Sequence, residues 1–198
     1  MDWPAYLGDS GSSQYSSLSQ INVDNVGLLE LAWTYRSGDV DPENRRQIQC
    51  NPIIIDGVLY GTSPKMKLFA LAAATGEELW RFDPFDDDYR LWGLGVNRGV
   101  TLWEDRTVYG AGEKIYALSK ESGEEIFAID LHVGLDERAE GLFLSSNTPG
   151  VVFENLPILG HRASENLPSV AGDIRAFDLE TGDLVWSFHT IPHPGELG

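Results

Sequence analysis

The side chains best suited to metal or acid–base chemistry are four histidines, and only two of them lie near each other in the sequence. His132 and His161 stand alone, so we assign neither a role. His189 and His193 are four residues apart, a spacing that brings two ligands together on one face of a helix, but Pro192 between them excludes a helix. We therefore do not expect these two histidines to form a metal-binding pair.

Three other side chains carry groups that could bind a ligand, but residue type and spacing alone single out none of them. The planar guanidinium of Arg98 suits bidentate binding of a carboxylate, and the amide of Gln49 can donate or accept a hydrogen bond. Glu165 offers the oxygen ligands that a hard cation prefers. Taken alone, they are a surface arginine, an ordinary amide and one of 31 acidic residues.

An eleven-residue repeat supplies the framework. Each copy begins with Ala, has Thr-Gly or Ser-Gly at positions six and seven, and ends in a large aromatic residue: Trp80, Phe127 and Trp186. Alternating apolar and polar residues before the turn predict a strand, and Gly can take the positive φ of a hairpin turn. The pattern predicts hairpins near residues 67–84, 114–131 and 173–190.

A second hairpin precedes each repeat copy. In the first, Asp56-Gly57 joins two apolar runs, which is a strong hairpin signal. Each unit therefore has four strands over roughly 45–60 residues, the size of a propeller blade. Residues 28–35, with Trp33 as the aromatic, resemble the second half of an earlier unit. We expect an all-β chain with an irregular arm at residues 1–24 and a partial β-propeller of about three to four antiparallel blades at residues 25–198.

Composition narrows the classes of function. A net charge of −17 and a pI near 4.4 argue against nucleic-acid binding, which requires a basic surface. The hydrophobic content of 42% supports a sizeable core, and no apolar run approaches the length of a membrane span. Cys50 is the only cysteine, which excludes an intrachain disulfide.

The repeat resembles the tryptophan-docking motif of pyrroloquinoline-quinone (PQQ) dehydrogenases, which are eight-bladed propellers. The resemblance covers nearly the whole chain, from Asp2-Trp3-Pro4-Ala5-Tyr6 onward. The strings at residues 49–52, 96–100 and 188–196 are similar to the membrane-bound glucose-dehydrogenase branch. Trp92-Gly93 stand where the alcohol branch has a cysteine pair, which favours the sugar or polyol branch.

The resemblance implies roles for several residues. Arg98 matches an arginine that pairs with PQQ carboxylates, Gln49 matches a position near the quinone, and Glu165 matches a calcium-ligating glutamate. Ser146 falls near a position that hydrogen-bonds PQQ, although Asn147 is an equally good match. The catalytic aspartate of the family has no counterpart in these residues, so we expect no catalytic residue in this chain and no activity from it alone.

The resemblance therefore implies a PQQ- and calcium-dependent dehydrogenase that oxidises a sugar, polyol or alcohol by hydride transfer to the quinone. It also implies a quinone or cytochrome as electron acceptor and a periplasmic location, with membrane attachment in the full-length protein as an open alternative. Another class of function is a non-catalytic propeller that binds proteins. Exposed blade edges would also favour self-association.

Overall fold

The computed structural model describes residues 2–40, 43, 47–86 and 96–196. It contains three four-stranded antiparallel sheets and one two-stranded sheet, which confirms the all-β prediction. The first sheet comprises β1 (Ile53–Ile55), β2 (Val58–Thr62), β3 (Leu68–Ala72) and β4 (Glu78–Phe82). The second comprises β5 (Thr101–Trp103), β6 (Arg106–Ala111), β7 (Lys114–Ser119) and β8 (Glu125–Asp130). The third comprises β10 (Val151–Phe153), β11 (Leu156–Gly160), β13 (Ile174–Phe177) and β14 (Leu184–Phe188).

The repeat has the same register in all three sheets. The first alanine of each copy lies directly opposite the aromatic residue, and the strand shifts register immediately afterwards; the pairs are Ala70↔Trp80, Ala117↔Phe127 and Ala176↔Trp186. A small residue opposite a large ring leaves space for that ring. The turn glycines Gly76, Gly123 and Gly182 have φ values of +74°, +73° and +80°, which side chains disfavour.

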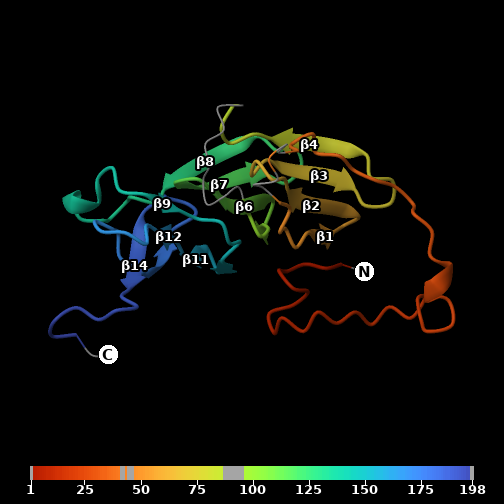
Figure 1. Ribbon diagram of the computed structural model, residues 1–198, viewed down its shortest axis with the longest axis horizontal. Helices are drawn as coiled ribbons and strands as arrows, with labels where there is room; N and C mark the ends of the chain where they lie inside the picture. Colours follow the sequence, from red (N-terminus) through yellow and green to blue (C-terminus); the bar gives the residue numbers. More distant parts are fainter. Residues whose placement is uncertain (1, 41–42, 44–46, 87–95, 197–198) are drawn as a thin grey trace.

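The sheets follow one another along the molecule like blades (Figure 1). One buried cluster lies between the first and second sheets and includes Tyr60, Trp80 and Tyr109. A second cluster lies between the second and third sheets and includes Ile115, Leu159 and Phe177. The core is therefore the set of interfaces between blades, so no single blade buries its apolar face alone.

Tryptophan indoles pack over turn glycines of the blades. Trp33 donates from Nε1 to the carbonyl of Ala73 at 3.2 Å, and its ring covers Gly76, where an added Cβ would lie 2.5 Å from the ring. Phe127 has no N–H to donate, and the atom nearest to a Cβ at Gly182 belongs to Ile129, at 3.8 Å. The ring-over-glycine contact is therefore missing at Gly182, where phenylalanine replaces the tryptophan.

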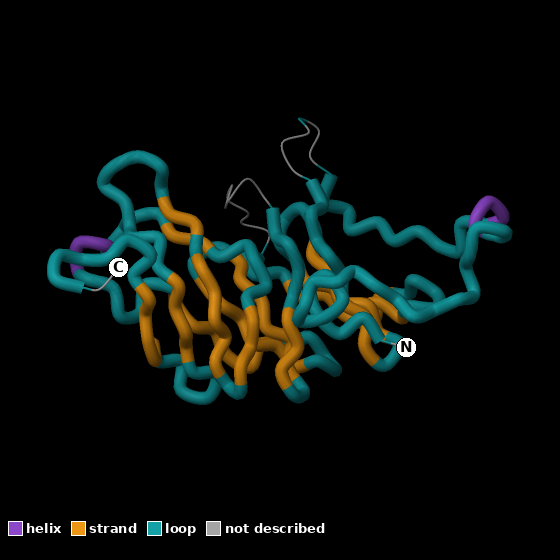
Figure 2. Tube along the Cα trace, turned by 90° about the horizontal axis from the view of Figure 1, so that it is seen from below, coloured by secondary structure: helices purple, strands orange, loops and turns teal. Residues whose placement is uncertain are grey.

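The N-terminal segment forms a long excursion beside the first sheet, with the 3-10 helix η1 (Val26–Leu28) at its far end (Figure 2). Trp3 pairs with Ile54, with reciprocal hydrogen bonds of 2.7 and 2.9 Å. Residues 29–35 form no strand in the described structure. The predicted likeness to the second half of a repeat unit holds at the ring, because Trp33 donates to Ala73 and covers Gly76 as Trp80 donates to Lys120 and covers Gly123.

Besides η1, the described residues form three short elements outside the three four-stranded sheets. β9 (Leu144–Ser145) pairs with β12 (Arg162–Ala163), and the 3-10 helix η3 (Glu137–Ala139) precedes both in the chain. Within the described ranges, no helix has the length and apolar character needed to cross a bilayer.

Candidate cofactor-binding site

The backbone of Arg98 joins three loops from different parts of the chain. Its carbonyl accepts a hydrogen bond from the Asn51 amide at 2.9 Å, and its own N–H donates to the Asn147 carbonyl at 3.0 Å. The loops lead into β1, β5 and β10, one strand from each of the three blades. Gln49 and Ser146 lie within two residues of these bonds, so three of the four predicted site residues belong to one junction.

The buried side chain of Asn97 forms three hydrogen bonds at this junction. Its side chain is 2% exposed, and its Oδ1 accepts from the Thr62 hydroxyl at 3.1 Å and from the Gly99 N–H at 2.9 Å. Its Nδ2 donates to the Gly110 carbonyl at 2.7 Å. One amide therefore connects the first blade, the Arg98 loop and the second blade. Sequence reasoning gave Asn97 no role, although it stands in the Asn-Arg-Gly string.

The residue after Arg98 must be glycine. Gly99 has a φ of +143°, and a Cβ there would lie 2.9 Å from the Asn51 carbonyl oxygen. The backbone on both sides of Arg98 is thus fixed, while its side chain is exposed. A cation on a rigid backbone loses less conformational freedom when it binds an anion.

Ser146 is fully buried, and its hydroxyl has no hydrogen-bond partner in the described part of the chain. Its N–H donates to the Gly112 carbonyl at 3.1 Å. A Cβ at Gly110 would lie 2.4 Å from the Ser146 Oγ, so only glycine fits there. An unpartnered buried hydroxyl is costly, and the neighbouring Ser145 hydroxyl is in the same state.

Gln49 is half-buried and precedes a shielded thiol. The Sγ of Cys50 accepts a hydrogen bond from the Thr62 N–H at 3.2 Å. Burial raises the pKa of the Cys50 thiol above its ordinary value, despite this hydrogen bond. Cys50 is therefore a structural neighbour of the junction and a poor nucleophile.

Comparisons with known proteins identify the chain. Residues 3–197 match the family model described as "PQQ: Glucose/ethanol/alcohol dehydrogenase, beta-propeller domain". The chain belongs to this family. The quinohemoprotein alcohol dehydrogenase of Comamonas testosteroni is 33% identical over 197 residues, which cover 96% of this chain and 26% of that protein.

Relatives occur in both the alcohol and the glucose branches. The quinoprotein glucose dehydrogenase of Escherichia coli is 29% identical over 214 residues, covering 94% of this chain and 27% of that protein. The structure of the quinohemoprotein alcohol dehydrogenase ADHIIG from Pseudomonas putida HK5 superposes with a TM-score of 0.80 at 28% identity, covering 96% of this chain and 27% of that one. The chain spans about a quarter of the length of the relatives that it matches.

The fourth predicted residue of this PQQ-family chain lies apart from the junction. Glu165 is exposed on a bend two residues after β12. Because β12 pairs antiparallel with β9 in the register Arg162↔Ser145, the chain runs away from Ser146 as it approaches Glu165. Glu165 therefore stays a predicted calcium ligand outside the hydrogen-bonded junction. Trp92-Gly93 lie outside the described residues.

The two histidines that the sequence places four residues apart lie close together in space. Pro192 does exclude a helix, but residues 189–196 form a loop that stacks the rings of His189 and His193, with centroids 4.0 Å apart. The loop therefore brings the two imidazole rings together without a helix.

Proposed function

We propose that this chain forms part of the cofactor-binding face of a PQQ-dependent dehydrogenase that oxidises a sugar, polyol or alcohol. The observation that carries the proposal is the junction at Arg98, where loops from three blades meet through Asn51 and Asn147. The family match over residues 3–197 supports PQQ as the ligand. The substrate class and the electron acceptor, which is a quinone or a cytochrome, are likewise proposed.

The residues at the junction suit a planar polycarboxylate. Arg98 presents an exposed guanidinium on a fixed backbone, and this group can bind a carboxylate through two parallel hydrogen bonds. Gln49 would add an amide, and the buried, unpartnered hydroxyl of Ser146 a donor or acceptor. When bound, PQQ supplies the electron-accepting quinone, whereas these residues orient it.

Fewer residues of this chain support the proposed calcium binding and the acid–base step. Glu165 would supply carboxylate oxygens to calcium from its exposed bend. We assign no general base to these residues, so substrate deprotonation would require a group elsewhere in a longer protein. We propose that this chain alone does not turn over substrate, and that the parent enzyme is periplasmic.

The test measures PQQ binding, with paired arginine variants, in a protein that contains this chain. Arg98→Ala should weaken PQQ binding at least about tenfold, since a charge-assisted bidentate contact is worth about 1.5–3 kcal/mol. Arg138→Ala is the matched control, because Arg138 is exposed and pairs with Asp136 in its own turn. Equal losses in the two variants would contradict the assigned role of Arg98.

Activity is tested separately by dye reduction with glucose, other polyols and alcohols, in the presence of PQQ and calcium. We expect turnover by a longer protein that contains this chain and none by residues 1–198. A protein that binds no PQQ and reduces no dye across this panel would instead support the non-catalytic propeller.

A further inference from the structure

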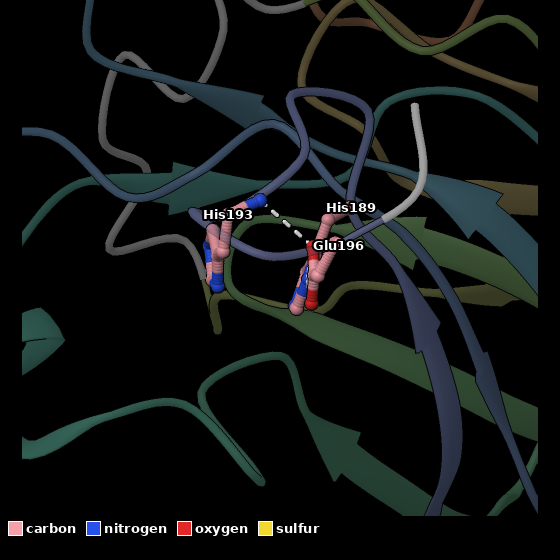
Figure 3. A group of neighbouring side chains, drawn as sticks. All are labelled: His189, His193 and Glu196. Carbon is pink, nitrogen blue, oxygen red and sulfur yellow. Dashed lines mark hydrogen bonds and ion pairs between the residues drawn. The ribbon is translucent and has the colours of Figure 1, made fainter.

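The loop after β14 gathers three side chains that could bind a metal ion. His189, His193 and Glu196 each offer a ligand atom, and these atoms all lie within 4.8 Å of one another. Figure 3 shows the two imidazoles and the carboxylate converging from one short loop. The three residues play no part in the proposed PQQ junction, so the inference does not rest on the proposed function.

Backbone hydrogen bonds hold this loop closed. The N–H of His193 donates to Glu196 Oε2 at 2.7 Å, and the N–H of Glu196 donates to the His193 carbonyl at 3.0 Å. Pro192 and Pro194 flank His193 and restrict the backbone further. A loop that is already closed loses less entropy when it binds an ion.

The ring of His189 lies between two carboxylates. Its Nδ1 lies 2.9 and 3.0 Å from the two oxygens of Glu196, and its Nε2 lies 3.9 Å from Oδ2 of Asp173. Asp173 is 6% exposed and accepts a hydrogen bond from the Ser187 hydroxyl at 3.5 Å. A metal-binding histidine commonly donates its other ring N–H to a carboxylate. Asp173 is the carboxylate that faces Nε2, and its Oδ2 must come closer than the present 3.9 Å to accept a hydrogen bond while Nδ1 faces Glu196.

The ligand set selects the class of ion. Two imidazole nitrogens with one carboxylate suit zinc and neighbouring transition metals, whereas calcium and magnesium prefer oxygen ligands alone. Tetrahedral zinc with ligand bonds of about 2.0–2.2 Å requires ligand atoms about 3.4 Å apart. The His189 and Glu196 atoms, at 2.9 and 3.0 Å, must therefore separate slightly, and any ligand atoms farther apart than this must approach one another. His193 is exposed and can turn from its stacked position to do so. The net charge of −17 favours cation binding generally.

We propose that His189, His193 and Glu196 form a binding site for a divalent transition-metal ion of the zinc class, with Asp173 orienting His189. Three protein ligands leave a fourth coordination position open. Both histidines also line a cavity of 460 Å³ that Asp173, Arg175 and Leu184 help to form. A bound ion would therefore lie beside a space large enough for a small ligand.

The test is a titration of the protein with Zn²⁺ alone, followed by calorimetry or by competition with a chromophoric chelator. We expect one site, and we expect His193→Ala and Glu196→Gln each to weaken it by more than about tenfold, since each removes a ligand. Asp173→Asn should weaken it by about 10–100-fold without removing a ligand. Circular dichroism of each variant establishes that it is folded.

The matched control is His132→Ala. His132 Nδ1 also lies against a carboxylate, 3.0 Å from Asp130 Oδ1, but Asp130–His132 is not part of the three-ligand group. This variant should bind Zn²⁺ as the unaltered protein does. Unchanged affinity in the His193 and Glu196 variants, no Zn²⁺ binding below millimolar concentration, or equal affinity for Ca²⁺ would each overturn the proposal. Co²⁺ should give the intense visible absorption of a tetrahedral site, and a weak octahedral spectrum in a folded protein would also contradict it.

Discussion

The indole of Trp80 donates from Nε1 to the backbone carbonyl of Lys120 at 3.1 Å, which joins the first blade to the turn of the second. The Trp80 side chain is 9% exposed, whereas Trp186 at the same position in the third blade is 38% exposed. The tryptophan at this repeat position is thus buried in Trp80, which lies between two blades, and partly exposed in Trp186, beside which no further blade is described. The contact depends on Gly123, where an added Cβ would lie 2.4 Å from the Trp80 ring.

Gly123→Ala should therefore destabilise the chain by about 2–5 kcal/mol, because positive φ costs about 1–2 kcal/mol and overpacking about 1–3 kcal/mol. Gly57→Ala is the matched control: Gly57 has a φ of +76°, but no atom lies within 4 Å of an added Cβ. This control should lose only the backbone cost. Urea unfolding of both variants measures the difference, and equal losses would show that the indole contact adds nothing.

Asn97→Ala should cost at least about 2 kcal/mol, since it leaves the Thr62 hydroxyl, the Gly99 N–H and the Gly110 carbonyl without their partner. Asn155→Ala removes only one bond, from Nδ2 to Asp178 at 3.0 Å, and should cost about 1 kcal/mol. Urea unfolding compares them. If Arg98 binds PQQ, Asn97→Ala should also weaken PQQ binding although it need not touch the cofactor. An Asn97 variant no less stable than the Asn155 variant would refute this role.

The Cys50 thiol should react slowly with a disulfide reagent in the folded chain. Burial raises its pKa, so at pH 8 less thiolate forms than in an ordinary cysteine, and access is restricted as well. The reaction rate should rise with pH throughout the range from pH 7 to pH 9. The same chain in denaturant is the control and should react at the rate of a free thiol. Equal rates in both states would contradict the burial of Cys50.

His161 should make stability depend on pH. Burial lowers the imidazole pKa below its ordinary value, and Arg175 and His132 add to this effect. The hydrogen bond of Nε2 to the Ala171 carbonyl, at 2.6 Å, and the carboxylate of Asp173 oppose it without cancelling it. The unfolded chain takes up the proton first as the pH falls below about 6.5, so this contribution to stability is present above that pH and declines below it.

NMR titration of the imidazole should give a midpoint below about 6.5 for His161 in the folded chain. His161→Gln keeps an amide donor for Ala171 and should flatten the pH dependence of unfolding between about pH 5 and pH 7. A midpoint at or above the ordinary value, or an unchanged pH profile in the variant, would refute the prediction.

Much of the scaffold was readable from the sequence because its signals are local. Asp56-Gly57 needs only its own backbone to form a turn, and both residues have positive φ, 51° and 76°. The pairing of Ala70 with Trp80 follows from a short hairpin in the same way. Residues 28–35 were read correctly as far as the ring is concerned, since Trp33 packs on a turn glycine as Trp80 does, although residues 29–35 form no strand in the described structure.

The sequence by itself determined the repeat, the blade and the residue types available for carboxylate and metal binding. Only the tertiary structure decided which of them meet. Arg98 lies between Asn51 and Asn147 because three blades pack side by side, and Glu165 lies outside that junction because β12 runs antiparallel to β9. His189 and His193 meet through a loop that hydrogen bonds close, a geometry that their spacing in sequence does not encode. Hairpins are set by neighbouring residues, whereas a site built from several loops is set by packing across the whole chain.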